Sequence, residues 1–540
     1  MQLTITGGRV VDGTGGPSRY ADLTVRDGLI TRCTGRSGPA PMITLDTGVE
    51  RLELTGDLVV TPGFVDIHTH SDLTLLSAPH APSALRQGIT TAVVGNCGLG
   101  MFPNPTDPAE HRLLRQAVAY ADVDPDVPWT WTDLDGYLDA LTTAGPAINV
   151  ATLTGHLPVH VAVAGHNREQ PSQGQLTRMQ ELLDSTLTAG AVGLSTGLVY
   201  PPLTQVGEDE LVGLAEVVAA HDALFAWHMA DYSDHLVGAL DQVIRVARRT
   251  GARTQVSHLV ANGERNHHRF AAALDRLTRA RADGLDIAAD VYPYTAGNCP
   301  LSQLLPARVT DAGLDHAVAN LRDPGQRPWI AEALEAYPVP WTMIDIYRIP
   351  DPDGDLVGLT VAQAAVARRQ PATELVLDLL AAHLHEVIVT IHGRHPDHVR
   401  QLFAHDGGLV ASDGLSLDPD GPTGVGAPHP RSYGCFPRLL ADFTGPGGLT
   451  LEQAVHKSTG FPASRIRLTD RGTIGAGQRA DLVIVDLDRV ADRADYRHPA
   501  VHPAGIVAVV VNGELVVGPR GPTGRRTGQV LRRPDRVEVP

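Results

Sequence analysis

The chain has 540 residues, of which 43% are hydrophobic and 19% charged, a balance typical of folded proteins rather than disordered chains. Its formal net charge of −17 argues against a nucleic-acid partner, because most of the surface would repel a polyanion. The sequence contains neither a signal peptide nor an apolar run of about 18 residues, which predicts a cytoplasmic protein without a membrane partner.

Both ends of the chain predict short β-strands, with glycine and aspartate at the bends. At the start these strands fill residues 2–60. Near the end the runs at 480–489 and 504–519 have the same character, and Asn512-Gly513 indicates a hairpin turn between two apolar runs. Two β-rich ends therefore flank one long middle segment.

The middle segment alternates short apolar strands with helices, the pattern of βαβ units and a parallel sheet. Eight predicted strands suffice for a closed (β/α)8 barrel. They end near His70, Cys97, His156, Leu198, Met229, His258, Tyr294 and Asp413. A ninth strand-like run at 386–393 is assigned to the long interval before Asp413. That interval is proline-rich and predicts an insertion at about residues 295–385 over the barrel mouth.

The first barrel strand carries a His-x-His pair in the sequence TPGFVDIHTH (61–70). Strand alternation predicts that Phe64, Asp66, His68 and His70 face the barrel interior, whereas Val65, Ile67 and Thr69 face the helices. Two imidazoles at the carboxyl end of a barrel strand indicate a metal site, since imidazole is a common metal ligand. Two buried core histidines are the alternative.

Other candidate ligands also end predicted strands. Cys97 supplies a thiol, His228 and His258 supply imidazoles, and Asp413 supplies a carboxylate. Each residue alone could be an ordinary buried side chain at a strand end. Because all these donors converge on the same rim of a parallel barrel, the set favours a zinc site.

These motifs resemble the amidohydrolase superfamily and, within it, the N-acyl-D-amino-acid deacylase (D-aminoacylase) family. The resemblance runs through TPGFVDIHTHSD, GITTAVVGNCG, GLSTGLVYPP, DVYPYTAGN, HPRSYGCFPR and RGTIGAGQRADLVIVD. It implies a (β/α)8 barrel over residues 61–469 and a small β-sandwich domain built from residues 1–60 and 470–540. It further implies a zinc-dependent hydrolase that cleaves the amide of an N-acyl-D-amino acid, a small-molecule substrate.

The resemblance also implies roles for individual residues. Zinc is expected to be held tightly by Cys97, His228 and His258, with a possible weaker second site at His68, His70 and Asp413 that Cys97 bridges. Asp413 would act as general base and acid. Tyr200 would stabilise the carbonyl oxygen, Arg431 would bind the substrate carboxylate, and Ser195 and His429 would contact the substrate. Packing roles are the alternatives for Tyr200, Ser195 and His429, and a solvated surface position is the alternative for Arg431.

Lysine is nearly absent from the sequence. Lys457 is the only one, and it lies in a predicted helix after the last barrel strand. The carboxylated lysine that bridges two metals in hydantoinase-like relatives is therefore not expected here.

Two positions depart from the family pattern, because Ala230 and Val260 stand where cations are common. Their loss weakens the expectation of an acidic substrate, unless Arg168, Arg265 or Arg269 supplies the charge.

Two alternative functions remain open. A hydrolase of a cyclic amide, dipeptide or acylated natural-product intermediate is one alternative. A non-catalytic barrel scaffold is another, and the oligomeric state is open.

Overall fold

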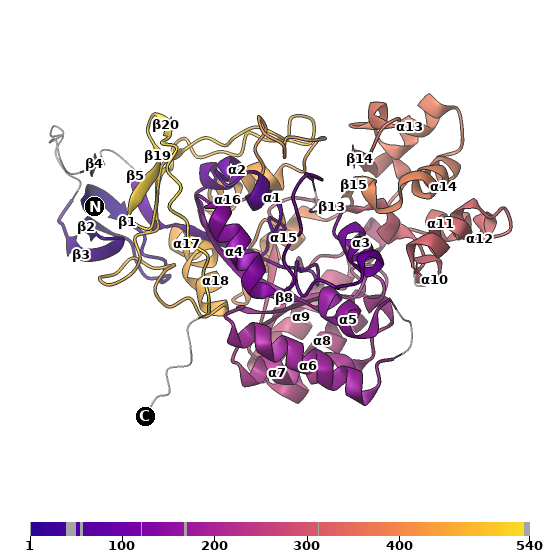
Figure 1. The fold of residues 1–540 in the computed structure, drawn as a ribbon. Helices are drawn as coiled ribbons and strands as arrows, with labels where there is room; N and C mark the ends of the chain where they lie inside the picture. The colour runs from indigo at the N-terminus through magenta and orange to yellow at the C-terminus, as the bar shows by residue number, and fades with distance from the viewer. Residues whose placement is uncertain are drawn as a thin grey trace.

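The computed structural model describes residues 2–38, 50–54, 58–119, 121, 123–166, 170–310 and 313–533. Its strands form three sheets, of which the central one is an eight-stranded parallel barrel. In Figure 1 the barrel and its helices lie between the terminal strands on one side and helices α10–α14 on the other. The predicted fold class is confirmed.

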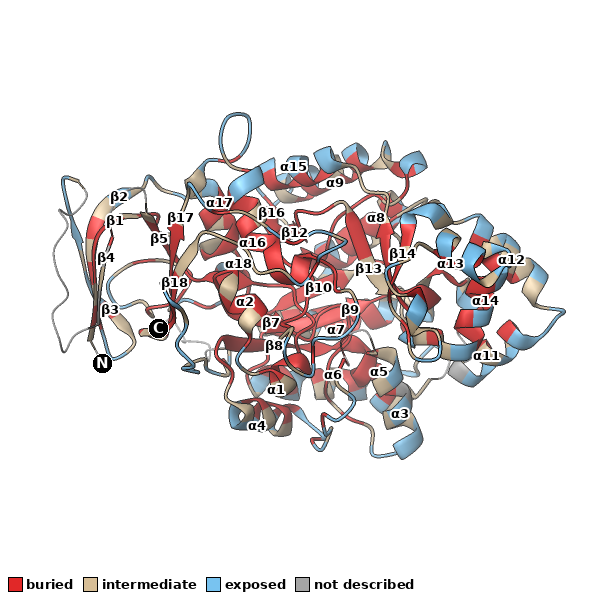
Figure 2. Cartoon of the chain, turned by 90° about the horizontal axis from the view of Figure 1, so that it is seen from above, coloured by how far each residue is buried: buried red, intermediate tan, exposed pale blue. Residues whose placement is uncertain are grey.

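The barrel strands follow one another in chain order around the sheet. They are β6 (Phe64–Asp66), β7 (Ile89–Val94), β8 (Asn149–Gly155), β9 (Gly193–Gly197), β10 (Leu224–His228), β11 (Arg253–Val256), β12 (Ile287–Val291) and β16 (Gly408–Val410). Almost every residue in them is buried, which explains why parallel strands appear in the sequence as nearly continuous apolar runs. Figure 2 shows these buried strands at the centre, with exposed residues on the outer faces of the helices.

Helices cover the outside of the barrel. They are α1 (Thr74–Ser77), α2 (Pro82–Arg86), α3 (Pro108–Ala117), α4 (Leu134–Ala144), α5 (His156–Ala164), α6 (Gln173–Thr188), α7 (Glu208–Ala220), α8 (Leu236–Thr250), α9 (Arg269–Ala282), α15 (Pro396–Ala404), α16 (Arg431–Asp442), α17 (Leu451–Ser458) and α18 (Gly460–Arg465). No helix in the described part of the chain is both long and apolar enough to span a bilayer.

The barrel closes where the first and last strands meet. Just beyond β6 and β16, Asp413 N donates to His68 O at 2.7 Å and His70 N donates to Gly414 O at 2.8 Å. Asp66 strengthens this seam, because its Oδ1 accepts the backbone N–H of Ser412 at 2.9 Å. The closing contacts therefore bring His68, His70 and Asp413 together, although about 340 residues separate them in sequence.

The predicted orientation of β6 is wrong. Phe64 stacks on Phe436 of α16 with ring centroids 5.3 Å apart, so it faces the helices. Val65 and Ile67 pack with residues of β7, β8, β10 and β16 inside the barrel. The strand spans only three residues, so strand alternation cannot be extended from Asp66 to the histidines that follow it.

The two ends of the chain share a nine-stranded sheet. Its order is β20 (Gly521–Pro522), β19 (Glu514–Gly518), β18 (Ile506–Val511), β17 (Leu482–Asp486), β5 (Leu58–Pro62), β1 (Gln2–Val10), β2 (Arg19–Arg26) and β3 (Leu29–Gly35), with β4 (Glu50–Glu53) also paired to β1. The antiparallel pairing of β5 with β17 joins the two ends.

A further unit follows β12 and has its own hydrophobic core. It contains β13 (Ala296–Pro300), α10 (Ala307–Thr310), α11 (Leu314–Arg322), α12 (Arg327–Glu335), β14 (Ile344–Arg348), α13 (Val361–Arg368), α14 (Ala372–His383) and β15 (Ile388–His392). Its strands form a separate sheet in the order β13-β15-β14. The ninth predicted strand is β15, so the unit continues past residue 385.

Candidate metal centre

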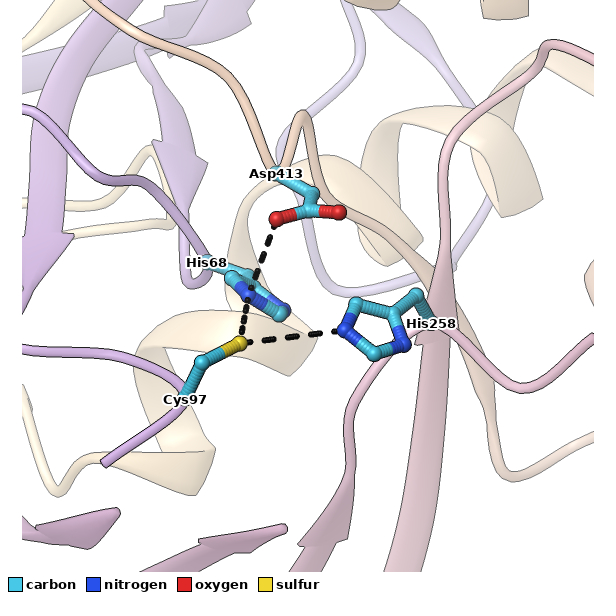
Figure 3. A group of neighbouring side chains, drawn as sticks. All are labelled: His68, Cys97, His258 and Asp413. Carbon is cyan, nitrogen blue, oxygen red and sulfur yellow. Dashed lines mark hydrogen bonds and ion pairs between the residues drawn. The ribbon is translucent and has the colours of Figure 1, made fainter. Parts of the chain in front are cut away.

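Four of the six predicted ligands form one buried cluster at the carboxyl end of the barrel. Donor atoms of His68, Cys97, His258 and Asp413 all lie within 4.8 Å of one another. His68 Nε2 lies 3.2 Å from Cys97 Sγ and 3.3 Å from Asp413 Oδ1, and Cys97 Sγ lies 3.7 Å from His258 Nε2 (Figure 3). His68 and Asp413 lie on the two sides of the barrel seam, and Cys97 and His258 follow the ends of β7 and β11.

The other two predicted ligands adjoin this cluster. His70 Nε2 lies 3.1 Å from Asp413 Oδ1, and His228 Nδ1 lies 3.1 Å from His258 Nε2. The structure therefore brings all six residues together, as the sequence predicted from their positions at strand ends. Their roles as ligands remain a proposal.

The backbone at the cluster is strained. Cys97, His258 and Asp413 have φ angles of 56°, 35° and 49°, in the left-handed region that non-glycine residues rarely adopt. Such conformations persist where the surrounding structure enforces them, and they concentrate at functional sites. Here each one follows the end of a barrel strand and turns a donor side chain toward the cluster.

Two groups of the cluster, Cys97 and Asp413, favour their anionic forms. Burial raises the pKa of the Cys97 thiol, but the imidazoles of His68 and His228 outweigh it and hold that pKa well below its ordinary value. Burial likewise raises the pKa of Asp413, yet Arg431 and His68 keep it well below the usual range. A thiolate, imidazole nitrogens and a carboxylate together form a donor set that fits zinc.

Asp290 is a functional candidate that the sequence analysis missed. Its Oδ1 lies 3.1 Å from His68 Nδ1 and accepts the backbone N–H of His258 at 2.8 Å, and its Oδ2 accepts from Gln255 at 2.8 Å. A carboxylate on the second nitrogen of a ligating imidazole fixes the ring and its tautomer. The sequence feature that could have identified Asp290 is a single acidic residue within the apolar strand IAADV.

His429 lies in the loop that enters α16, and Arg431 is the first residue of that helix. Arg431 is 1% exposed, and its Nη1 donates to Asp413 Oδ2 at 2.7 Å. His429 is buried; its Nε2 lies 3.1 Å from Ala296 O, and its Nδ1 accepts the backbone N–H of Arg431 at 3.0 Å. Arg431 therefore contacts the candidate general base, whereas His429 ties its loop to β13.

Ser195 and Tyr200 belong to the GLSTGLVYPP motif at the end of β9. Ser195 is fully buried and its hydroxyl bonds the turn that carries Cys97, accepting from Gly98 N at 2.8 Å and donating to Gly95 O. Tyr200 packs its ring against His228, with centroids 5.4 Å apart. Burial holds the pKa of Tyr200 well above its ordinary value, so its hydroxyl stays protonated at neutral pH.

The two positions that depart from the family pattern line a cavity of about 190 Å³ beside the cluster, together with His228, His258 and Asp413. Ala230 and Val260 contribute no charge to it. Arg265 pairs with Asp234 on the surface, 2.6 Å away, and Arg269 donates to Asn266. Arg168 lies outside the described residues.

A second buried group of ligand type lies behind β9. Glu210 Oε1 lies 2.8 Å from His156 Nε2 and 2.7 Å from His160 Nδ1. Burial raises the pKa of Glu210, but hydrogen bonds from the two histidines outweigh it and lower that pKa to about 2. This trio joins α5 to α7 through direct hydrogen bonds.

A closed parallel barrel with a histidine, cysteine and aspartate cluster at its carboxyl rim defines a class of metal-dependent hydrolase scaffold. The family model described as "Amidohydrolase family" matches residues 55–517. The chain belongs to this amidohydrolase family.

Individual relatives are similar over nearly the whole chain. N-acyl-D-glutamate deacylase of Alcaligenes xylosoxydans xylosoxydans is 34% identical over 99% of this chain and 97% of its own length. The structure of N-acyl-D-glutamate deacylase from Bordetella bronchiseptica, complexed with zinc and a phosphonate mimic of the tetrahedral intermediate, has a TM-score of 0.81 at 33% identity, covering 98% of this chain and 99% of that one. A D-aminoacylase with a binuclear metal centre has a TM-score of 0.79 at 30% identity, with the same coverage.

Proposed function

We propose that this protein is a zinc-dependent deacylase that hydrolyses the amide bond of an N-acyl-D-amino acid. The observation that carries the proposal is the buried cluster of His68, Cys97, His258 and Asp413 at the barrel rim. The similarity to N-acyl-D-glutamate deacylases over nearly the full length of the chain also supports the proposal.

In this proposal Cys97, His228 and His258 hold zinc tightly. A weaker second site would use His68, His70 and Asp413 together with Cys97. Bound zinc would activate a water molecule and polarise the amide carbonyl. Asp290 would hold the His68 ring in place through its Nδ1.

Asp413 would accept the proton of the attacking water and return it to the leaving nitrogen, because an amine leaves poorly unless it is protonated. Its Oδ2 is oriented by Arg431. The Tyr200 hydroxyl, which stays protonated, would donate to the carbonyl oxygen as negative charge develops there. Substrate contacts by Ser195, His429 and Arg431 remain predictions.

The neighbouring space favours a bulky apolar substituent on the substrate. A cavity of about 280 Å³, lined largely by apolar residues such as Leu198, Pro300 and Leu305, shares Ala230 and Gln303 with the cavity at the cluster. A long acyl chain or a large apolar side chain would fit this lining better than a second charged group. Because this lining is largely apolar, a cyclic amide or a dipeptide is the second candidate substrate class.

The test is amine release by zinc-loaded protein from matched N-acyl amino acids that differ in configuration, acyl length and side chain. We expect strong preference for D over L substrates and faster release with larger apolar groups. Absence of release from every N-acyl-D-amino acid by fully zinc-loaded protein would refute the proposal and direct attention to cyclic amides and peptides.

We also propose that residues 1–60 and 470–540 form one small domain, which the pairing of β5 with β17 supports. The cytoplasmic location and the lack of nucleic-acid and membrane partners remain predictions.

A further inference from the structure

The cavity beside the metal cluster has a second wall, supplied by the unit that follows β12. Asn298, Cys299 and Arg394 line it together with His228, His258 and Asp413. Asn298 and Cys299 belong to β13, and Arg394 lies two residues beyond the end of β15. The same cavity is therefore lined both by residues of the metal cluster and by a guanidinium.

The charge of Arg394 is not neutralised within the described part of the chain. No carboxylate lies within 4.0 Å of its guanidinium there, although such pairs engage many of the other arginines. Its Nε donates to Asn262 Oδ1 at 3.2 Å, its guanidinium stacks on the ring of Tyr292 at 4.8 Å, and its buried Nη1 has no hydrogen-bond partner among the described residues. A buried donor on a charged group without a partner is costly, which indicates a missing acceptor.

The acids that line the cavity are already engaged. Asp413 is bonded to Arg431 and His70, and the Oδ1 of Asp231 accepts the backbone N–H groups of Ser233 and His235. Arg431 also stacks on Tyr292, at 4.5 Å, but its charge is balanced by Asp413. Of the two guanidinium groups on Tyr292, the one at Arg394 therefore lacks a carboxylate partner among the described residues.

Gly297 gives Arg394 its position. A Cβ built at Gly297 would lie 2.5 Å from Arg394 Nη2, so any other residue there would displace the guanidinium. The backbone at Gly297 does not have the positive φ that requires glycine. The absence of a side chain at Gly297 thus allows Arg394 to approach closely.

We propose that Arg394 binds a carboxylate of the substrate in the cavity that the metal cluster also lines, a role that the uncharged Ala230 and Val260 cannot fill. The inference rests on the proposed deacylase function, because it assigns a ligand group to the same cavity. Guanidinium and carboxylate pair well, and Arg394 lines the cavity with an Nη1 donor that has no acceptor among the described residues. The α-carboxylate is the expected group, and a side-chain carboxylate has the same chemistry.

The experiment compares parent protein with Arg394→Met, Arg394→Lys and Gly297→Ala on three substrates. N-acetyl-D-leucine carries only an α-carboxylate, its α-amide carries none, and N-acetyl-D-isoglutamine carries only a side-chain carboxylate. Arg276→Met is the matched control, because Arg276 pairs with Asp241 on the exposed side of α8 and α9. Thermal unfolding checks that each variant is folded.

We expect Arg394→Met to raise KM for N-acetyl-D-leucine by about 10- to 100-fold, the loss expected for a hydrogen bond to a charged group, with little change for the amide. Arg394→Lys should recover part of the loss, and Gly297→Ala should reproduce it in milder form. A loss confined to N-acetyl-D-isoglutamine would support the same contact with a side-chain carboxylate. Equal losses on acid and amide, or an unchanged KM for both acids, would overturn the inference.

Calorimetric binding of the same three compounds separates this inference from the proposed function. If parent protein binds the acids without hydrolysing them and Arg394→Met does not bind them, the deacylase proposal fails and the carboxylate site stands. If parent protein and Arg394→Met bind them equally, or if neither binds them, the carboxylate site is refuted.

Discussion

Replacing Asp413 by asparagine should separate proton transfer from metal binding. The tight ligands proposed here, Cys97, His228 and His258, are unchanged in Asp413→Asn, so zinc should be retained at that site. Loss of a positioned general base typically lowers turnover by about 10²- to 10⁴-fold. The ion pair with Arg431 is buried, with side chains only 1% and 8% exposed, so the variant should also lose about 3 kcal/mol of stability.

Three measurements check this prediction: zinc content by mass spectrometry, kcat on the best N-acyl-D-amino acid, and urea unfolding. Asp492→Asn is the control for stability. The Asp492 side chain is also buried; it accepts from Tyr294 Oη at 2.7 Å and pairs with Arg438 at 3.4 Å. The control should be destabilised yet keep its turnover. Turnover at the parent rate in Asp413→Asn would refute the acid and base role.

Two further predictions concern the metal and the fold. Cys97→Ala should empty the tight site, and zinc content equal to that of parent protein after dialysis would contradict the ligand assignment. Glu210→Gln should lose about 3 kcal/mol at pH 7, because the folded Glu210 has its pKa lowered from 4.5 to about 2. A lowered pKa stabilises the fold above about pH 4.5, and this contribution disappears as the pH falls toward 2. Urea unfolding of parent and variant at pH 7 and pH 3 measures it, and equal stability at pH 7 would refute it.

The barrel was predictable because its signal is local. Each parallel strand is buried on both faces and stands out as an apolar run between helices. The orientation of β6 was not predictable in the same way, because strand alternation holds only while the chain stays extended. The strand ends at Asp66, and the direction of His68 is set by its contact with the other edge of the barrel seam, which the local sequence does not contain.

The candidate ligands were predictable because a parallel barrel places the ends of all its strands on one rim. Two other residues of the site were harder to predict. Asp290 gave only a weak signal in the sequence, because it is a single charged residue within an apolar strand. Burying such a charge is costly unless it has partners. Arg394 gave no signal in the sequence. It follows strand β15, outside the barrel, and its neighbours are set by the packing of the unit that follows β12 against the barrel rim.

The single lysine of the sequence lies away from the cluster. Lys457 Nζ donates to the backbone oxygens of His405 and Gly408, so it stabilises the start of β16, at the end of that strand opposite Asp413. A bridging group derived from lysine is therefore not supplied by any residue of this chain. Cys97 Sγ lies between His68 and His258 and has its pKa held well below the ordinary value, so it supplies a negative charge at that position without modification. Cys97 and Asp413 therefore both favour their anionic forms at the cluster, and Asp413 is paired with Arg431.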